Sequence, residues 1–218
     1  MMSSYRSVFD IIGPTMIGPS SSHTAGAVKI GRAARKAFMG RVKEIKVDYY
    51  ESFAATHAGH GTDYAIIAGV LGLKTDDARV PHAVEIARSK GIKVTFIEHK
   101  EPSPINHPNT ALVTLSNHVK KVQVGGCSIG GGTIEVRQME ILGQQIKLKG
   151  SLPALVCLGN KEQLEMVRER MKNDHVGVVN RKVTRMKENF AEEFDITKDV
   201  AQHTIDKLAD VCSKVIDL

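Results

Sequence analysis

The chain has 218 residues, of which 42% are hydrophobic and 25% are charged, and its formal net charge is +6. This composition is that of a globular protein with room for one large domain or two small ones, and it excludes an extensively disordered chain. Because no apolar run approaches the about 18 residues that a membrane span needs, we expect no membrane insertion. The first residues lack the apolar core of a signal peptide, which favours a cytoplasmic location.

The basic residues are dispersed, with a local excess over 181–187, and aromatic residues make up only 5% with no Trp. Nucleic-acid binding favours a basic stripe with aromatic platforms, so a solvated basic face is the preferred interpretation and no nucleic-acid partner is expected. The positive charge would also attract an anionic substrate.

The three cysteines, Cys127, Cys157 and Cys212, form no Cys-x-x-Cys pair. Their spacing supports neither a zinc site nor a self-contained iron–sulfur cluster, and their odd number argues against a disulfide scaffold. We therefore expect reduced thiols and no metal site in this chain.

A run rich in hydroxyl groups, Gly18-Pro19-Ser20-Ser21-Ser22-His23-Thr24-Ala25-Gly26, precedes an amphipathic helix predicted over 23–39. A serine of the run is suited to cap that helix, and the remaining N–H groups favour a carboxylate or phosphate. His23 adds a group that titrates near neutral pH. The run therefore predicts an anion-binding helix start; the alternative is an ordinary serine-rich cap. Gly26 and Gly31 would let the helix pack closely.

A strand over 45–50 and a loop over 54–61 follow, and then a helix over 62–72 with Thr62 as N-cap and Asp63 in its first turn. A helix over 81–90 begins at Pro81 and stops at Gly91. The next elements are a strand over 92–98, a loop over 100–109 and strands near 111–116, 119–126, 133–140 and 144–149.

A glycine-rich stretch over 125–132 lies between two of these strands. It would let the backbone approach a ligand or another chain closely; a β-bulge or a wide turn explains it equally well.

The pattern restarts near residue 150. A strand over 152–158, a helix over 161–173, a hairpin of 176–186 and 190–196, a helix over 198–208 and a strand over 211–216 give the order βαββαβ. This is the ferredoxin-like arrangement, so we expect an α+β protein with domains over 1–150 and 151–218.

Three histidines lie at joints between elements: His23, His60 and His107. His60, between two glycines and before a helix, is placed to act as a general base; the alternative is an exposed hinge. His107-Pro108-Asn109-Thr110 also reads as a simple turn. The other histidines are predicted to lie on the surface: His57, His82, His99, His118, His175 and His203. Neither a metal site built from the three loops nor a serine hydrolase is supported by ligand spacing or a nucleophile elbow.

Five segments together resemble one family, the iron–sulfur-dependent L-serine dehydratases, and within it the beta chain of the two-subunit bacterial form. They are Tyr5–Pro14, Ile17–Gly26, Gly59–Asp63, His107–Thr110 and Ser128–Gly132, and the resemblance covers about residues 5–150.

The resemblance implies deamination of L-serine to pyruvate and ammonia. In that family a 4Fe-4S cluster, held by the cysteines of an alpha chain, acts as Lewis acid on the serine hydroxyl while a base removes the α-proton. His60 matches the base, with His23 near the substrate carboxylate or sharing the proton transfer, and the two roles could be exchanged. The resemblance implies a substrate pocket completed by the alpha chain and lined by Ser20, Ser21, Ser22, Thr24, Asn109 and Thr110.

The family's beta chain resembles the allosteric substrate-binding domain of some phosphoglycerate dehydrogenases, and residues 151–218 resemble an ACT domain. The turn Leu158–Gln163 departs from the Gly- or Asp-rich turn that holds an amino acid in ACT domains. A dimerising role is therefore at least as well supported, and we expect a homodimer through either domain. Glu51 stands where the family favours Gly before Ser52, which would reshape the loop leading to His60.

Two functions remain open at this point. The chain is either the beta half of an L-serine ammonia-lyase or a non-catalytic amino-acid-binding regulatory module. A phosphate-binding structural protein has only the helix start in its favour.

Overall fold

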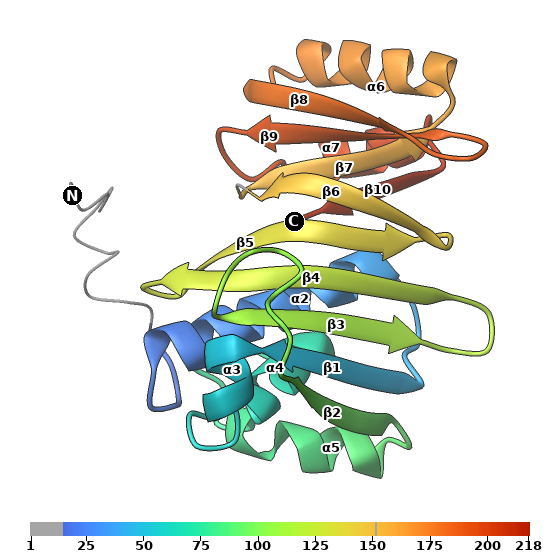
Figure 1. The fold of residues 1–218 in the computed structure, drawn as a ribbon. Helices are drawn as coiled ribbons and strands as arrows, with labels where there is room; N and C mark the ends of the chain where they lie inside the picture. The colour runs from blue at the N-terminus through green and yellow to red at the C-terminus, as the bar shows by residue number, and fades with distance from the viewer. Residues whose placement is uncertain (1–14, 151) are drawn as a thin grey trace. The chain divides into compact units, whose positions relative to one another are not determined.

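The computed structural model describes residues 15–150 and 152–218 (Figure 1), so the Tyr5–Pro14 motif lies outside the described residues. The chain divides into two compact units, Met1–Lys149 and Gly150–Leu218. Each combines helices with its own β-sheet, which makes the protein α+β, with two sheets. Within the described ranges no helix is long and apolar enough to cross a bilayer.

The first unit is built on a six-stranded sheet with the order β2-β1-β3-β4-β5-β6. Its strands are β1 (Glu44–Tyr50), β2 (Lys93–His99), β3 (Thr110–Ser116), β4 (Lys121–Gly130), β5 (Thr133–Ile141) and β6 (Gln144–Gly150). β1 runs parallel to β2 and antiparallel to β3, and the ladders β3–β4 and β4–β5 are antiparallel. The strands predicted from the sequence are all present.

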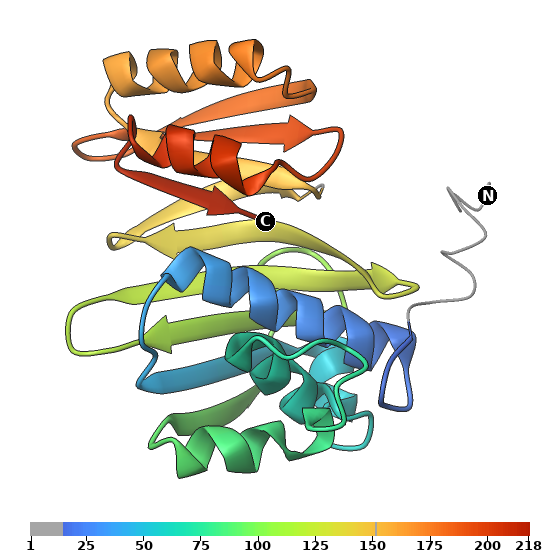
Figure 2. The ribbon, with the colours of Figure 1, turned by 180° about the vertical axis from the view of Figure 1, so that it is seen from behind.

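Its helical segments are η1 (Ser21–Ala25), α2 (Gly26–Phe38), α3 (Glu51–Thr56), α4 (Thr62–Leu71), η2 (Val80–His82) and α5 (Ala83–Ser89). Helices α2, α4 and α5 lie on one face of the sheet (Figure 2). The buried side of α2 includes Val28, Ile30 and Phe38, which are fully inaccessible to solvent. This apolar layer holds the helix start against the sheet and so fixes the position of the hydroxyl-rich run.

Helices α2 and α4 approach each other closely at two glycines. A Cβ added to Gly31 would lie 2.1 Å from the carbonyl oxygen of Ile66, and one added to Gly69 would lie 2.0 Å from that of Val28. Gly26 packs in the same way on Ser128, whose Oγ would lie 2.5 Å from an added Cβ. The close packing predicted for Gly26 and Gly31 is confirmed.

Three local predictions in this unit were wrong. The stretch 54–61, predicted as loop, includes the end of helix α3, which occupies Glu51–Thr56. Thr62 does not cap α4, because Gly61 takes the N-cap position in the left-handed conformation (φ 72°) and places Thr62 inside the first turn. Pro81 lies in the 3-10 turn η2 rather than at the first position of α5.

The glycine-rich stretch 125–132 belongs largely to strand β4, which extends to Gly130. The register of β4 against β5 shifts between Gly125 and Gly126 and again between Ser128 and Gly130. A Cβ on Gly126 would lie 3.1 Å from the side chain of Ile30. The β-bulge interpretation therefore holds, and the glycines admit helix α2 close to the strand.

The second unit contains β7 (Ala154–Gly159), α6 (Lys161–Asn173), β8 (Val178–Arg185), β9 (Phe190–Ile196), α7 (Gln202–Ala209) and β10 (Lys214–Asp217). They follow one another as βαββαβ, as the sequence predicts, and form a sheet with the order β10-β7-β9-β8. Its core brings together Leu155, Val167 and Phe194, among others. On β9, Glu192 is fully buried and accepts hydrogen bonds from the guanidinium of Arg168, 2.9–3.1 Å long.

The turn between β7 and α6 is occupied by a capping box. Asn160 Oδ1 accepts from the backbone N–H of Gln163 at 2.9 Å, and Gln163 Oε1 accepts from that of Asn160 at 3.0 Å. The polar side chains of the turn are therefore used to start helix α6.

Candidate active site

The three histidine-bearing segments meet at one end of the first sheet. Tyr50, the last residue of β1, pairs with Thr110 at the start of β3, and Thr110 pairs with Cys127 on β4. Antiparallel pairing thus places the end of β1, the start of β3 and the end of β4 side by side. The backbone N–H of Phe53 also donates to the carbonyl of Pro108 at 3.3 Å, which joins α3 to the His107 loop.

Ser20 caps the helical run that leads into α2, as predicted for a serine of this segment. Its backbone is extended (φ −146°, ψ 129°), and its Oγ accepts from the backbone N–H of His23 at 3.2 Å. Ser22 Oγ lies 3.2 Å from Ser20 Oγ and 2.9 Å from His23 Nδ1. Ser21 begins η1, and its carbonyl accepts from the N–H of Gly26. The hydroxyl groups of Ser20 and Ser22 therefore lie beside Nδ1 of His23 at a helix start.

Thr24 connects this helix start to the loop of His60. The residue is fully buried, and its Oγ1 donates to the carbonyl oxygen of His60 at 3.2 Å. The peptide of His60 is further held by its N–H, which donates to Thr56 at 3.0 Å. Thr24 thus fixes the backbone at His60 and leaves the exposed imidazole of that residue available.

The rings of His23 and His60 contact each other, with centroids 4.8 Å apart and planes inclined by 82°. The ring of Phe53 also contacts that of His23, with centroids 5.1 Å apart. Burial, and to a smaller extent the neighbouring His60, lower the pKa of His23 from its usual 6.5. His23 is therefore neutral at pH 7 and able to accept a proton. Its Nε2 is buried and has no hydrogen-bond partner among the residues described.

Two histidines predicted on the surface are partly or largely buried, and for these the prediction was wrong. His57 is 9% exposed, stacks on Tyr49 at 4.5 Å, and bonds to both Asp63 and Glu98. His99 stacks on Tyr50 and bonds to the buried Asp48 at 2.8 Å. The remaining four, His82, His118, His175 and His203, are exposed as predicted.

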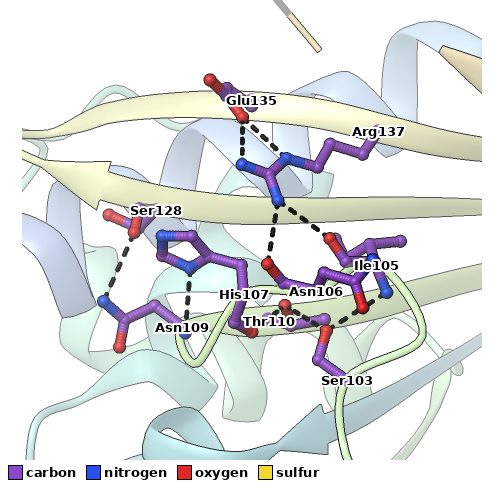
Figure 3. Close-up of polar contacts among 9 residues, drawn as sticks. All are labelled: Ser103, Ile105, Asn106, His107, Asn109, Thr110, Ser128, Glu135 and Arg137. Carbon is purple, nitrogen blue, oxygen red and sulfur yellow. Dashed lines mark hydrogen bonds and ion pairs between the residues drawn. The ribbon is translucent and has the colours of Figure 1, made fainter. Parts of the chain in front are cut away.

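The His107 loop is held by an internal network of hydrogen bonds (Figure 3). His107 Nδ1 accepts from the backbone N–H of Asn109 at 3.1 Å, and burial, followed by the nearby Arg137, lowers the pKa of His107. The side-chain amide of Asn109 donates to the carbonyl of Ser128 at 3.3 Å. Thr110 Oγ1 is fully buried, donates to the carbonyl of His107 at 2.5 Å and accepts from Ser103 Oγ at 2.8 Å. The network sets the shape of the loop and the direction of Asn109.

Arg137 and Glu51 attach the same loop to its surroundings. Arg137 pairs with Glu135 at 2.7 Å and donates to the carbonyls of Ile105 and Asn106 at 2.9 and 3.0 Å (Figure 3). Glu51 Oε1 accepts from the backbone N–H of Ser103 at 2.9 Å, and Glu51 itself is left-handed with φ 48°. This φ accounts for the glycine expected at the position, and the carboxylate joins the start of α3 to the His107 loop.

Two buried hydroxyl groups at this end of the sheet were not among the predicted site residues. Ser128 Oγ and Thr62 Oγ1 are buried and lack a hydrogen-bond partner within the described part of the chain. Ser128 lies against Gly26, at the junction of η1 and α2. Its sequence signals were the glycine-rich stretch that surrounds it and its place in the Ser128–Gly132 segment of the resemblance.

The residues that the structure describes do not fit a metal or an iron–sulfur cluster. Across residues 15–150 and 152–218 no group of three or more His, Cys, Asp or Glu is arranged to hold a metal ion. All three cysteines are buried and free. Burial raises the pKa of the Cys127 thiol to about 11, whereas cluster ligation requires thiolates.

Sequence comparison relates the chain to one family of known proteins. A sequence model described as "Serine dehydratase beta chain" matches residues 7–139. The chain is 49% identical over 156 residues to the "Probable L-serine dehydratase, beta chain" of Bacillus subtilis (strain 168), which covers 72% of this chain and 69% of that protein. It is 35% identical over 151 residues to the "L-serine dehydratase, beta chain" of Peptoniphilus asaccharolyticus, which covers 69% of this chain and 67% of that protein.

A third relative is matched over a smaller share of its length. The "L-serine dehydratase 2" of Escherichia coli (strain K12) is 47% identical over 152 residues, covering 59% of this chain and 33% of that protein. The matched regions include the helix start at Ser20 and the His60 and His107 loops, because the family model spans all of them. The chain belongs to the serine dehydratase beta chain family.

Proposed function

We propose that this chain is the beta subunit of an L-serine dehydratase and that, with an alpha chain, it deaminates L-serine to pyruvate and ammonia. The observation that carries the proposal is the contact of His23 with His60 at a serine-capped helix start, in a chain of this family. The enzyme class is that of an L-serine ammonia-lyase, and this chain supplies one part of it.

The proton chemistry is assigned to the histidine pair. His60 is exposed and has its backbone fixed by Thr24, so it takes the α-proton of serine as general base. His23 is neutral at pH 7 because burial and His60 lower its pKa, and it serves as proton acceptor beside His60 or as the group next to the substrate carboxylate. The contact between the two rings supports either distribution of the roles.

The substrate carboxylate is assigned to the helix start. Ser20, Ser21, Ser22 and Thr24 place hydroxyl groups and first-turn amides at the positive end of a helical segment that continues into α2. Asn109 borders this region from the His107 loop, where its amide is anchored to Ser128. Thr110 is proposed to shape the same pocket from beneath, since its hydroxyl is engaged on both sides.

We assign the 4Fe-4S cluster implied by the resemblance to the alpha chain. Support comes from the three buried, free thiols of this chain and from the beta chain naming of its relatives. The pocket is completed by that partner, which accounts for a proton-transfer pair lying at the surface of this chain.

The second unit is proposed to be an ACT-like module over residues 151–218 that pairs two copies of the chain. The βαββαβ order and the strand order β10-β7-β9-β8 support this. The capping box of Asn160 and Gln163 occupies the turn where ACT domains hold an amino acid, which favours pairing over ligand binding. The non-catalytic regulatory module is not favoured, since the relatives are named as dehydratase chains.

The test is reconstitution. The full chain is co-expressed with a cysteine-bearing alpha chain and purified without oxygen, and pyruvate formation from L-serine is measured. We expect serine-dependent pyruvate from the pair and none from either chain alone. A stable complex with a loaded cluster that leaves L-serine unchanged would contradict the proposal, and tight serine binding by this chain alone, measured by calorimetry, would favour a regulatory module.

A further inference from the structure

His57 is held between two carboxylates from different elements. Its Nδ1 lies 2.6 Å from Asp63 Oδ1 on α4, and its Nε2 lies 2.8 Å from Glu98 Oε1 on β2. The His57 side chain is 11% exposed, that of Asp63 23%, and that of Glu98 65%. Both ring nitrogens therefore face acceptors, and both bonds form only if both nitrogens carry a proton.

The surroundings favour that doubly protonated ring. Burial alone would lower the pKa of His57, but the hydrogen bonds and charges of Glu98 and Asp63 outweigh it, and the pKa lies above the usual 6.5. Among the described residues, two aromatic rings also lie against His57: Tyr49 on β1, stacked at 4.5 Å between centroids, and Phe96 on β2. Burial holds the pKa of Tyr49 well above 10, so Tyr49 stays neutral while His57 titrates.

The same residues enclose the segment that carries His60. The carbonyl of His57 accepts from the backbone N–H of Thr62 at 3.0 Å. The side chains of His57 and Asp63 bond across the same turn. Glu98 attaches this closed turn to the sheet. The turn that carries His60 is thus bounded by residues that are bonded to His57 through both backbone and side chain.

We propose that His57 is a positioning residue for His60: as an imidazolium bonded to Asp63 and Glu98, it holds the turn Ala58–Thr62 so that His60 lies against His23, and loss of one proton from His57 releases that turn. The inference rests on the proposed function for its kinetic effect only. The bonding of His57 and its effect on the turn are properties of this chain.

The direction of the pH effect follows from the sign of the shift. Because the pKa of His57 is raised on folding, its contribution to the free energy of unfolding is complete below 6.5 and is lost as the pH rises through the folded value. An ordered His60 turn is therefore a property of solution below the folded pKa of His57, and kcat should fall as the pH rises through that pKa and the turn is released.

The kinetic test compares Glu98→Gln and His57→Gln with the wild-type complex of this chain and its alpha chain. Glu98→Gln removes the negative charge beside the His57 ring and so lowers the pKa of His57. The alkaline fall of kcat should therefore move to lower pH. His57→Gln should lower kcat by about 10- to 100-fold with a much smaller change in KM, since misplacement of a base affects the chemical step. The alkaline fall assigned to His57 should then be absent.

A matched control is provided by another histidine–glutamate pair. His82 Nδ1 lies 3.3 Å from Glu85 Oε2, with side chains 68% and 78% exposed. Glu85→Gln should leave the pH profile of kcat unchanged. If Glu98→Gln and Glu85→Gln give the same profile as the wild type, the inference is overturned.

A second measurement does not depend on turnover or on the folding of a variant. In the full wild-type chain, hydrogen exchange at the Thr62 amide and NMR titration of the His57 ring are followed across pH. Exchange at Thr62 should accelerate beyond the intrinsic effect of pH as His57 loses its proton. Constant protection of Thr62 through the titration of His57 would overturn the inference. If protection of Thr62 does follow the titration of His57 but the complex does not turn over serine, only the proposed function is contradicted.

Discussion

The hydroxyl of Thr24 donates to the carbonyl oxygen of His60 at 3.2 Å, and this bond joins the two halves of the candidate site. Thr24 belongs to the serine-capped segment η1, and His60 to the turn between α3 and α4. Thr24 is fully buried and follows His23 in the chain, so the bond ties the backbone next to His23 to the backbone of His60. The bond involves neither imidazole ring, so each ring can be replaced without removing it.

The first prediction concerns the two rings themselves. His60→Ala and His23→Ala should each lower kcat of the complex by about 10²- to 10⁴-fold, the usual contribution of general acid–base catalysis. Steady-state pyruvate formation measures the loss. His118→Ala, at an exposed histidine between β3 and β4, is the control and should be active. Wild-type turnover in both ring variants would remove the histidines from the mechanism.

The second prediction concerns the charge on His23. Burial is the larger cause of its lowered pKa, and His60 is the smaller. His60→Gln should therefore raise the pKa of His23 but leave it below 6.5, because the burial remains. NMR titration of the His23 ring in the full chain measures the change. A lower pKa in the variant, or one that returns fully to 6.5, would show that the two causes have been ranked wrongly.

Much of this site follows from local sequence chemistry. A cap by one serine of the run was predictable because hydroxyl side chains accept from first-turn amides, although Ser20 itself was not identified. His60 stood out because a histidine between glycines precedes a helix. The chain order of strands and helices in the second unit followed from apolar periodicity and turn residues alone. These features depend on neighbours only a few residues away.

The parts that sequence reasoning missed depend on distant neighbours. His57 is buried because β1 offers Tyr49 and β2 offers Glu98, and neither is adjacent to it in sequence. Thr62 lost the capping position because Gly61 adopts a left-handed conformation. For 125–132 the sequence left a β-bulge or turn open beside a close backbone approach, and only the pairing with β5 and the contact of Gly126 with Ile30 identify the bulge.

The third prediction concerns Glu51, which combines a strained backbone with a useful bond. Glu51→Ala loses the bond to the Ser103 N–H and keeps φ near 48°, whereas Glu51→Gly loses the bond and relieves the backbone. The glycine variant should be more stable than the alanine variant by about 1 kcal/mol, the scale of a left-handed residue with a side chain. Urea unfolding of the two variants measures the difference.

Glu51→Gln separates the two effects further. A glutamine keeps an oxygen that can accept from Ser103, so it should stay nearest to the wild type in stability. If the alanine variant equals or exceeds the glycine variant, the left-handed conformation of Glu51 is not a source of strain.

The fourth prediction concerns the contact between α2 and α4 that supports the helix start. An alanine at Gly31 would place its Cβ 2.1 Å from the Ile66 carbonyl oxygen, and backbone cannot move aside as a flexible side chain can. Overpacking of this kind costs about 1–3 kcal/mol, more than the about 0.5–1 kcal/mol that alanine gains over glycine inside a helix. Gly31→Ala should therefore destabilise the chain.

Gly59→Ala is the matched control, since its Cβ would meet only the Thr56 carbonyl at 3.9 Å, and its stability should stay within about 0.5 kcal/mol of the wild type. Equal unfolding midpoints for the two variants would mean that α2 and α4 do not pack as closely as Gly31 requires.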